Sequence, residues 1–265
     1  MIANNSNKLQ NECKPFKEEN MAGVGELPAR MSEEAACAKL LEVGAVAIRD
    51  VDGGEEPFLY SSGNFGPGYV MVKGTVGRQD VFKPLVEQLA LRLVDEGVEF
   101  DNIAGNATGG MIPAYQCRED YQRMTGKDIG YVYVRGTRKE GGHKELITGL
   151  DHIPETREDG SPAHWLVVEE LVNFGETTTN SLNLLRGLGF VANKGATILH
   201  YDHAEVNAKL AENNIDLTRL TTLPNLLDVA VNEGFYSQDA VASYRDFLAS
   251  PAEWQRVRGI EPVQR

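Results

Sequence analysis

Two adjacent carboxylates, Glu169 and Glu170, are the side chains in this sequence that are best suited to bind a ligand. They follow an apolar run that starts at Trp165 and is short enough for a strand buried on both faces. A polar turn with one glycine and three threonines comes next, and leucines at 182, 184, 185 and 188 predict a helix that starts near Thr177. Carboxylates can hold ribose hydroxyls directly or through a hydrated divalent metal, while turn amides at a helix N-terminus can bind a phosphate. The stretch 165–186 therefore predicts a site for a phosphorylated sugar.

A second loop should lie beside this stretch. Strands and helices alternate from residue 76 to residue 222, which predicts a doubly wound, mostly parallel sheet of the α/β class. In such a sheet the ligands bind beyond the carboxyl ends of the strands. Both the glycine-rich turn 105–110 and the stretch 169–177 fall at those ends. We expect strands near 102–105, 130–135, 165–168, 195–200 and 217–222, with helices near 79–96, 112–124, 177–188 and 204–213.

The segments outside this α/β core divide into three regions. Residues 1–30 are rich in Asn, Lys and Glu and are expected to form a mobile tail. Residues 31–75 predict a helix and short lid strands, at 45–49 and 58–60 around the turn 52–54 and at 69–72 after a glycine-rich loop. This hairpin is either a lid over a site or a plain edge hairpin. Residues 223–265 predict a C-terminal helical segment.

A charged, glycine-containing loop spans 135–150 and carries Arg135 and Lys139. Mobile loops of this composition can deliver cations to a phosphate-rich site, and the alternative is a solvated basic surface loop. The two functions of Arg135 that remain open are a ligand contact and a surface ion pair.

The overall composition excludes several classes of protein. A net charge of −13 at pH 7 disfavours a nucleic-acid binder, which needs a basic face. No apolar run approaches the roughly 20 residues of a membrane span, and no signal peptide is visible. Three widely spaced cysteines indicate neither a disulfide framework nor a zinc site. We therefore expect a cytoplasmic protein without a membrane or nucleic-acid partner.

Four motifs in this order resemble those of the type I phosphoribosyltransferases, and of orotate phosphoribosyltransferases in particular. Residues 167–177 are similar to the family's motif for phosphoribosyl pyrophosphate (PRPP), and residues 103–110 resemble its pyrophosphate loop. Residues 135–149 are similar to the flexible catalytic loop of orotate enzymes, and residues 58–69 to the lid strand and loop that close over the base. The resemblance covers about residues 35–205 and implies a type I phosphoribosyltransferase fold with a small N-terminal hood and C-terminal helices.

The resemblance also implies a reaction and its residues. A ring nitrogen of a base displaces pyrophosphate from C1 of PRPP, with Mg²⁺ as cofactor and a homodimer as the assembly. It implies catalytic roles for Lys139, Arg135 and Glu170, with Glu169 and Glu170 also near the metal through PRPP or water. It implies base contacts from Ser61, Tyr69 and His203. The residues that it assigns to PRPP binding are Glu169, Glu170, Asn173, Phe174, Gly175, Glu176, Thr177, Thr178, Thr108, Gly109 and Gly110.

The sequence departs from the family pattern at several of these positions. Glu170 stands where the family usually has Asp, and Glu176 where a small or hydroxyl residue is usual. Ser61 replaces a lysine of the orotate enzymes, and His203 an arginine that helps to hold the orotate carboxylate. Three functions therefore stay open: an orotate phosphoribosyltransferase, a phosphoribosyltransferase for a different base, and a non-catalytic protein of the same fold that senses PRPP or nucleotides.

Overall fold

A six-stranded sheet forms the centre of the molecule, in the strand order β10-β9-β8-β5-β6-β7. The computed structural model describes residues 26–136 and 146–263. All neighbouring strands are parallel except β6 and β7, which are antiparallel. The strands are β5 (Asn102–Asn106), β6 (Gly130–Val134), β7 (Ile147–Thr148), β8 (His164–Val172), β9 (Val191–His200) and β10 (Asp216–Thr222).

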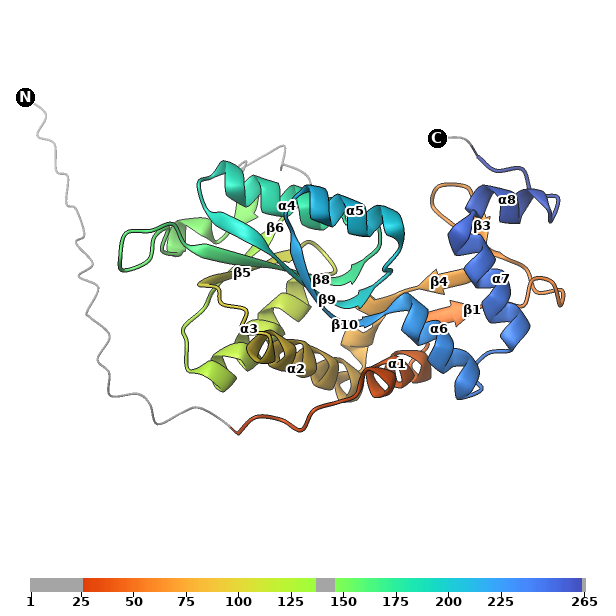
Figure 1. Ribbon diagram of the computed structural model, residues 1–265, viewed down its shortest axis with the longest axis horizontal. Coiled ribbons are helices and arrows are strands. Elements are labelled where there is room, and N and C mark those ends of the chain that lie inside the picture. The colour runs from red at the N-terminus through yellow and green to blue at the C-terminus, as the bar shows by residue number, and fades with distance from the viewer. Residues whose placement is uncertain (1–25, 137–145, 264–265) are drawn as a thin grey trace, which may run out of the picture.

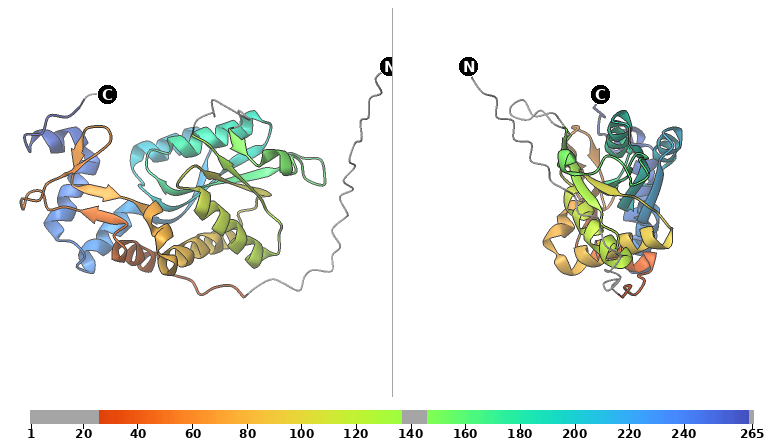
Figure 2. Two further views of the ribbon diagram at one scale, coloured as in Figure 1. Left: turned by 180° about the vertical axis from the view of Figure 1, so that it is seen from behind. Right: turned by 90° about the vertical axis from the view of Figure 1, so that its left-hand side faces the viewer.

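Helices cover both faces of this sheet (Figure 1). On one face lie α2 (Gln79–Asp95) and α3 (Met111–Thr125), and on the other α4 (Glu176–Gly187) and α5 (Ala204–Glu212). The end-on view in Figure 2 shows the sheet between these two helical layers. Side chains of β8 alternate between the two cores: Leu166 and Val168 belong to the core under α2 and α3, whereas Trp165 and Val167 belong to the core under α4. The predicted doubly wound α/β fold is confirmed.

The remaining elements form a second body, here called the hood, beyond the carboxyl ends of β8 and β9 (Figure 1). Two short antiparallel pairs, β1 with β4 and β2 with β3, make up its N-terminal part. Although residues 31–75 and 223–265 are far apart in sequence, helices from both lie side by side there, α1 against α6. The hood comprises α1 (Glu33–Glu42), β1 (Val46–Ile48), β2 (Phe58–Leu59), β3 (Phe65–Gly66), β4 (Gly68–Val70), α6 (Leu223–Asn232), α7 (Gln238–Ala249) and α8 (Pro251–Arg256).

Helix caps fix where several of these elements begin. The hydroxyl of Ser32 accepts a hydrogen bond from the amide of Ala35 at 3.1 Å, as expected for an N-cap. A 3₁₀ helix, η1 (Val72–Gly77), connects β4 to α2 and packs against β8. The hood is therefore joined to the core directly beside the strand that carries the acidic pair.

Three expectations about the elements are wrong in detail. The strands at 45–49 and 58–60 do not pair around the turn 52–54, because β1 pairs with β4 and β2 with β3. The expected strand 69–72 ends at residue 70, and η1 begins at Val72. Strand β7 of the six-stranded sheet and the first four residues of β9 were not expected. β7 has only two residues, and the start of β9 lacks an apolar pattern.

Among the residues that the structure describes, none of the helices combines the length and apolar character that a membrane crossing requires.

Candidate functional site

Glu169 lies within β8, which continues to Val172, and is held by a chain of buried hydrogen bonds. The side-chain amide of Asn106, at the end of β5, donates to Oε1 of Glu169 at 2.5 Å. Oδ1 of Asn106 in turn accepts from the hydroxyl of Ser181, on α4, at 2.5 Å. All three side chains are buried. Because the chain links α4, β5 and β8, it fixes one carboxyl oxygen of Glu169 where these three elements meet.

Burial makes the carboxyl group of Glu169 a weaker acid than that of an exposed glutamate. It raises the pKa of Glu169 to about 8; the hydrogen bond from Asn106 lowers the pKa, and the nearby charge of Glu170 raises it further. The carboxyl is therefore protonated at neutral pH in the free protein. A ligand that brings hydroxyls or a cation would favour the charged form of the same group.

Glu170 rests directly on the glycine-rich turn that follows β5. A Cβ placed on Gly109 would overlap the carboxylate of Glu170, and a Cβ on Gly110 would overlap the backbone oxygen of Val168. The peptide bond between Ala107 and Thr108 in this turn is cis. Two segments 60 residues apart are thus in direct backbone contact at the carboxyl edge of the sheet, as the sequence predicted for their ends.

Lys73, which the sequence analysis did not single out, contributes positive charge to this site. Burial raises the pKa of Glu170, and a backbone hydrogen bond and the charge of Lys73 in η1 oppose that rise. The side chain of Lys73 is exposed. Lys73 lies near Glu170 because η1 packs against β8, and no local sequence pattern indicates that contact.

The turn after β8 encloses a cavity of about 230 Å³ at the N-terminus of α4. Gly175, the residue before the helix, has a φ of 71°, a left-handed conformation that glycine adopts without steric cost. The first-turn amides of the 12-residue helix α4 are the groups that bind anions at such a terminus. Seven residues predicted to bind PRPP line this cavity: Glu169, Asn173, Phe174, Gly175, Glu176, Thr177 and Thr178.

Glu176 directs its charge toward α5. Its side chain is 75% exposed and forms an ion pair with Nζ of Lys209 at 3.5 Å. The negative charge of Glu176 is therefore partly neutralised by Lys209 of α5, which reduces its repulsion of an anion bound at the phosphate loop.

A second cavity, of about 430 Å³, adjoins the first, and Thr177 and Glu176 line both. Arg135 lies on its wall, where Nη2 donates to the hydroxyl of Tyr133 at 3.1 Å and Nε to Oγ1 of Thr148 at 3.2 Å. Asn106 and Ala107 complete the wall on the side of β5. The structure thus brings Arg135 to the same edge of the sheet as the acidic pair. Lys139, the other predicted catalytic cation, lies outside the described residues.

The three predicted base-contact residues lie on two bodies. Ser61 and Tyr69 belong to the hood; Ser61 is exposed, and the ring of Tyr69 lies 5.7 Å from that of Phe58. His203 follows β9 and caps α5, where its Nδ1 accepts the amide of Val206 at 3.3 Å. Its ring packs edge-on against Phe174 at 5.1 Å, and its buried Nε2 has no hydrogen-bond partner among the residues that the structure describes. His203 therefore lies beside the phosphate loop.

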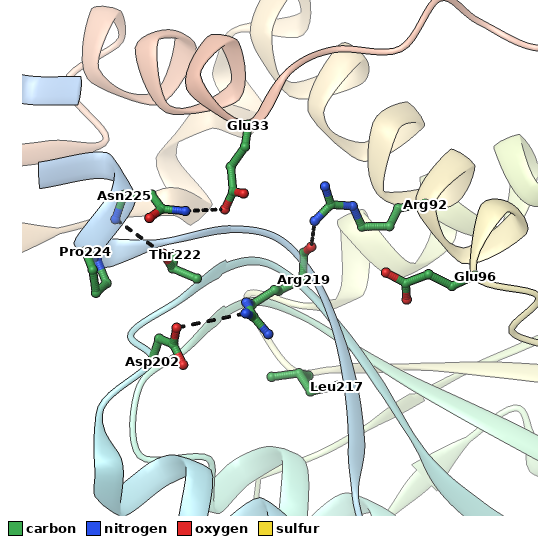
Figure 3. Close-up of a pocket in the computed structure, with 9 residues that line it drawn as sticks. All are labelled: Glu33, Arg92, Glu96, Asp202, Leu217, Arg219, Thr222, Pro224 and Asn225. Atoms are coloured by element: carbon green, nitrogen blue, oxygen red, sulfur yellow. Dashed lines mark hydrogen bonds and ion pairs between the residues drawn. The ribbon is translucent and has the colours of Figure 1, made fainter. Parts of the chain in front are cut away.

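Another cavity, of about 340 Å³, lies along the edge strand β10 and is separate from these groups (Figure 3). Asp202 reaches it from the loop after β9 and faces Arg219 at 4.0 Å. The acids of this cavity have partners: Glu33 accepts from Asn225 at 2.8 Å, and Glu96 accepts from Thr218. We assign a structural role to these groups because they satisfy one another.

Comparison with known proteins supports the resemblance seen in the sequence. No protein-family model matches the chain. An orotate phosphoribosyltransferase of Listeria innocua is 28% identical over 222 residues, which cover 84% of this chain and 98% of the relative. That of Bacillus caldolyticus is 28% identical over 217 residues, covering 82% of this chain and 96% of the relative.

Solved structures agree in fold. The crystal structure of orotate phosphoribosyltransferase from Aeropyrum pernix matches with a TM-score of 0.56 and 20% identity, over 76% of this chain and 99% of that one. The Mycobacterium tuberculosis H37Rv enzyme in complex with PRPP matches with a TM-score of 0.52 and 17% identity, over 74% and 99%. The chain is thus a type I phosphoribosyltransferase in fold, and along most of its length it is similar to orotate phosphoribosyltransferases.

Proposed function

We propose that this chain is a PRPP-dependent phosphoribosyltransferase of the orotate phosphoribosyltransferase kind. It would join the ribose 5-phosphate of PRPP to a ring nitrogen of a base and release pyrophosphate. One observation carries the proposal: the Glu169–Glu170 pair lies between a helix-terminus cavity lined by the predicted phosphate loop and the backbone of Gly109 and Gly110. This order of groups matches the order of groups along PRPP, which is phosphate, ribose hydroxyls and pyrophosphate.

Each part of PRPP then has a binding group. The amides at the start of α4, with the hydroxyls of Thr177 and Thr178, would bind the 5′-phosphate. The carboxylates of Glu169 and Glu170 would hold the ribose hydroxyls. The backbone amides of the turn Thr108–Gly110 would bind the pyrophosphate.

The chemical step requires stabilisation of negative charge on the leaving pyrophosphate. As the bond to C1 breaks, positive charge develops on the ribose and negative charge on the phosphate oxygens. Arg135 lies on the wall of the adjoining cavity, and Lys139 belongs to the loop that starts beside it. A cation at the position of Arg135 would stabilise the departing charge and thereby lower the barrier.

The residues present suit a magnesium ion that arrives with PRPP. Within residues 26–136 and 146–263, no three His, Cys, Asp or Glu residues form a metal-binding group. Mg²⁺ commonly binds through one or two carboxylates together with substrate phosphates, and Glu169 and Glu170 supply that number of carboxylates. When bound, the ion would neutralise charge on the pyrophosphate and ribose oxygens.

A transferase for a base other than orotate is the second candidate, and one observation favours it. Nδ1 of His203 accepts the amide of Val206, so this nitrogen is not free to donate to a ligand. Ser61, at the position of a lysine in the orotate enzymes, offers no positive charge to the carboxylate of orotate. An uncharged base would avoid this mismatch.

The similarity to orotate enzymes supports two further parts of the proposal, a homodimer and a cytoplasmic location.

The test is pyrophosphate release from PRPP and Mg²⁺ with a panel of bases that includes orotate, uracil, hypoxanthine and adenine. We expect release with one base, and its loss in Lys139→Ala and Glu170→Gln but not in the exposed control Lys83→Ala. Release with orotate establishes the first candidate, and release with another base alone establishes the second. PRPP binding without release with any base would refute the transferase and leave a PRPP-sensing protein.

A further inference from the structure

The loop of the predicted lid, residues 61–64, is tied to the C-terminal end of the described chain. Oδ1 of Asn64 accepts the amide of Val263 at 2.8 Å, and its Nδ2 donates to the carbonyl of Val263 at 3.4 Å. This reciprocal pair joins residues 199 positions apart in sequence. Nothing in the local sequence of the lid loop predicts such an attachment.

Gln255 in α8 forms the second attachment. Its Oε1 accepts the amide of Phe65 at 2.9 Å, and its Nε2 donates to Oδ1 of Asn64 at 3.4 Å and to the carbonyl of Pro251 at 3.2 Å. The residue is 1% exposed. A buried amide with both ends hydrogen-bonded holds the lid backbone at a fixed distance from α8, because either bond is costly to lose there.

Aromatic side chains extend this attachment to the core. Tyr60, just before the lid loop, donates to the carbonyl of Gly68 at 2.5 Å, and its ring lies 5.9 Å from Phe247 in α7. Tyr244, also in α7, is buried against Gly68, where a Cβ would overlap its ring. The Tyr244 phenol lies against that of Tyr201, the first residue after β9. The lid, α7 and the end of β9 therefore meet in one packed cluster, two residues before His203.

We propose that the C-terminal segment 255–263 acts as a strap that holds the lid loop 61–64 in place for base binding, with Gln255 as its positioning residue. This inference rests on the proposed function, since it assigns the lid to the base. If the lid loop is already ordered in the free protein, binding of the base does not cost the entropy of ordering it. The strap therefore affects the affinity for the base and not the affinity for PRPP.

Three substitutions, one deletion and one matched control test the strap. Gln255→Ala removes both lid bonds from α8, and Asn64→Ala removes the bonds to Val263 and the one from Gln255. Asn64→Asp keeps the oxygen that accepts from Val263 and Gln255 but loses the donor to the carbonyl of Val263, so its effect should be smaller than that of Asn64→Ala. Gln238→Ala, at an exposed glutamine in α7, is the control. Deletion of residues 263–265 removes the outer attachment without touching the buried Gln255, in case Gln255→Ala folds poorly.

Two readouts are measured for each variant. Hydrogen exchange of the peptide 58–66 should become faster in both alanine variants and in the deletion. The KM for the active base should rise about tenfold in the same variants, with kcat and the KM for PRPP changed less than twofold. Melting temperatures should stay close to that of the original chain for the deletion and for Gln238→Ala.

The outcomes separate the strap from the proposed function. Unchanged exchange in 58–66 overturns the strap. Faster exchange with an unchanged KM for the base overturns its role in base binding, and an equal rise in both KM values points to a general loss of structure and overturns it too. If the original chain is inactive with every base, the proposed function fails and the base-binding role fails with it, whereas the exchange data still decide whether the strap fixes the loop.

Discussion

Glu169→Gln should make the protein more stable relative to the original chain as the pH rises. Burial raises the pKa of Glu169 in the folded protein to about 8, from the ordinary value of 4.5. Between these two values the unfolded chain has released the proton that the folded chain keeps, so unfolding becomes easier as the pH increases. Gln is neutral at every pH, and its amide oxygen can still accept from Asn106. The substitution therefore removes this pH-dependent loss.

The size of the effect follows from the two pKa values. At pH 5 the unfolded state has released most of the proton, and the loss is about 1 kcal/mol. At pH 7 it is about 3 kcal/mol, because each unit of pH between the two values adds about 1.4 kcal/mol. Any pH-independent cost of the substitution shifts both values equally. The difference between the two proteins should thus change by about 2.5 kcal/mol over these two units, in favour of Gln.

Urea unfolding of both proteins at pH 5, 6, 7 and 8 measures this difference directly. Glu176→Gln serves as the control, because that side chain is 75% exposed and should give a pH-independent difference. A difference between Glu169→Gln and the original chain that stays constant within about 0.5 kcal/mol from pH 5 to 8 would refute the claim that burial holds this proton. In the original chain, the affinity for PRPP with Mg²⁺ should also rise as the pH increases toward 8, and Glu169→Gln should lack this rise.

Two further substitutions test the rest of the site. Gly109→Ala places a methyl group against the carboxylate of Glu170 and should weaken PRPP binding, measured by calorimetry, at least about tenfold. The control is Gly187→Ala, whose Cβ meets nothing within 4 Å and which should bind PRPP normally. Equal PRPP affinities of the two variants would contradict the close approach of Glu170 to Gly109. Lys73→Ala removes the positive charge near Glu170 and should raise the KM for PRPP about threefold in steady-state assays. Lys73→Arg should restore the original KM, and Lys83→Ala, at an exposed lysine, should leave it unchanged. The same KM in Lys73→Ala and Lys83→Ala would contradict a role of Lys73 in PRPP binding.

Periodicity and turn chemistry in the sequence determined most of the fold. The short apolar run before Glu169 predicted a buried strand, and the helical spacing of 79–96 predicted α2 (Gln79–Asp95) to within a residue. Because parallel strands end at a common edge, the sequence also predicted that the turn 105–110 and the stretch 169–177 would meet. These inferences depend on neighbours in the chain, where the pattern of side chains carries the information.

The hood was predicted less well, since its strands have two or three residues each and no periodicity long enough to recognise. These strands are bonded to Tyr236, just before α7, and to Gln255 in α8, both about 190 residues away in the chain. A short strand has little preference of its own, so distant partners decide which strand it joins.

Tertiary structure alone decided the chemical state of the site. The residue types showed two adjacent acids, but only packing shows that Glu169 is buried, bonded to Asn106 and weakly acidic, while Glu176 turns outward to Lys209. Burial and charge pairing depend on what other elements bring to a side chain, and a sequence read along the chain does not contain those distances. The acids' position at the edge of the sheet was therefore determined by the sequence, and their protonation by the fold.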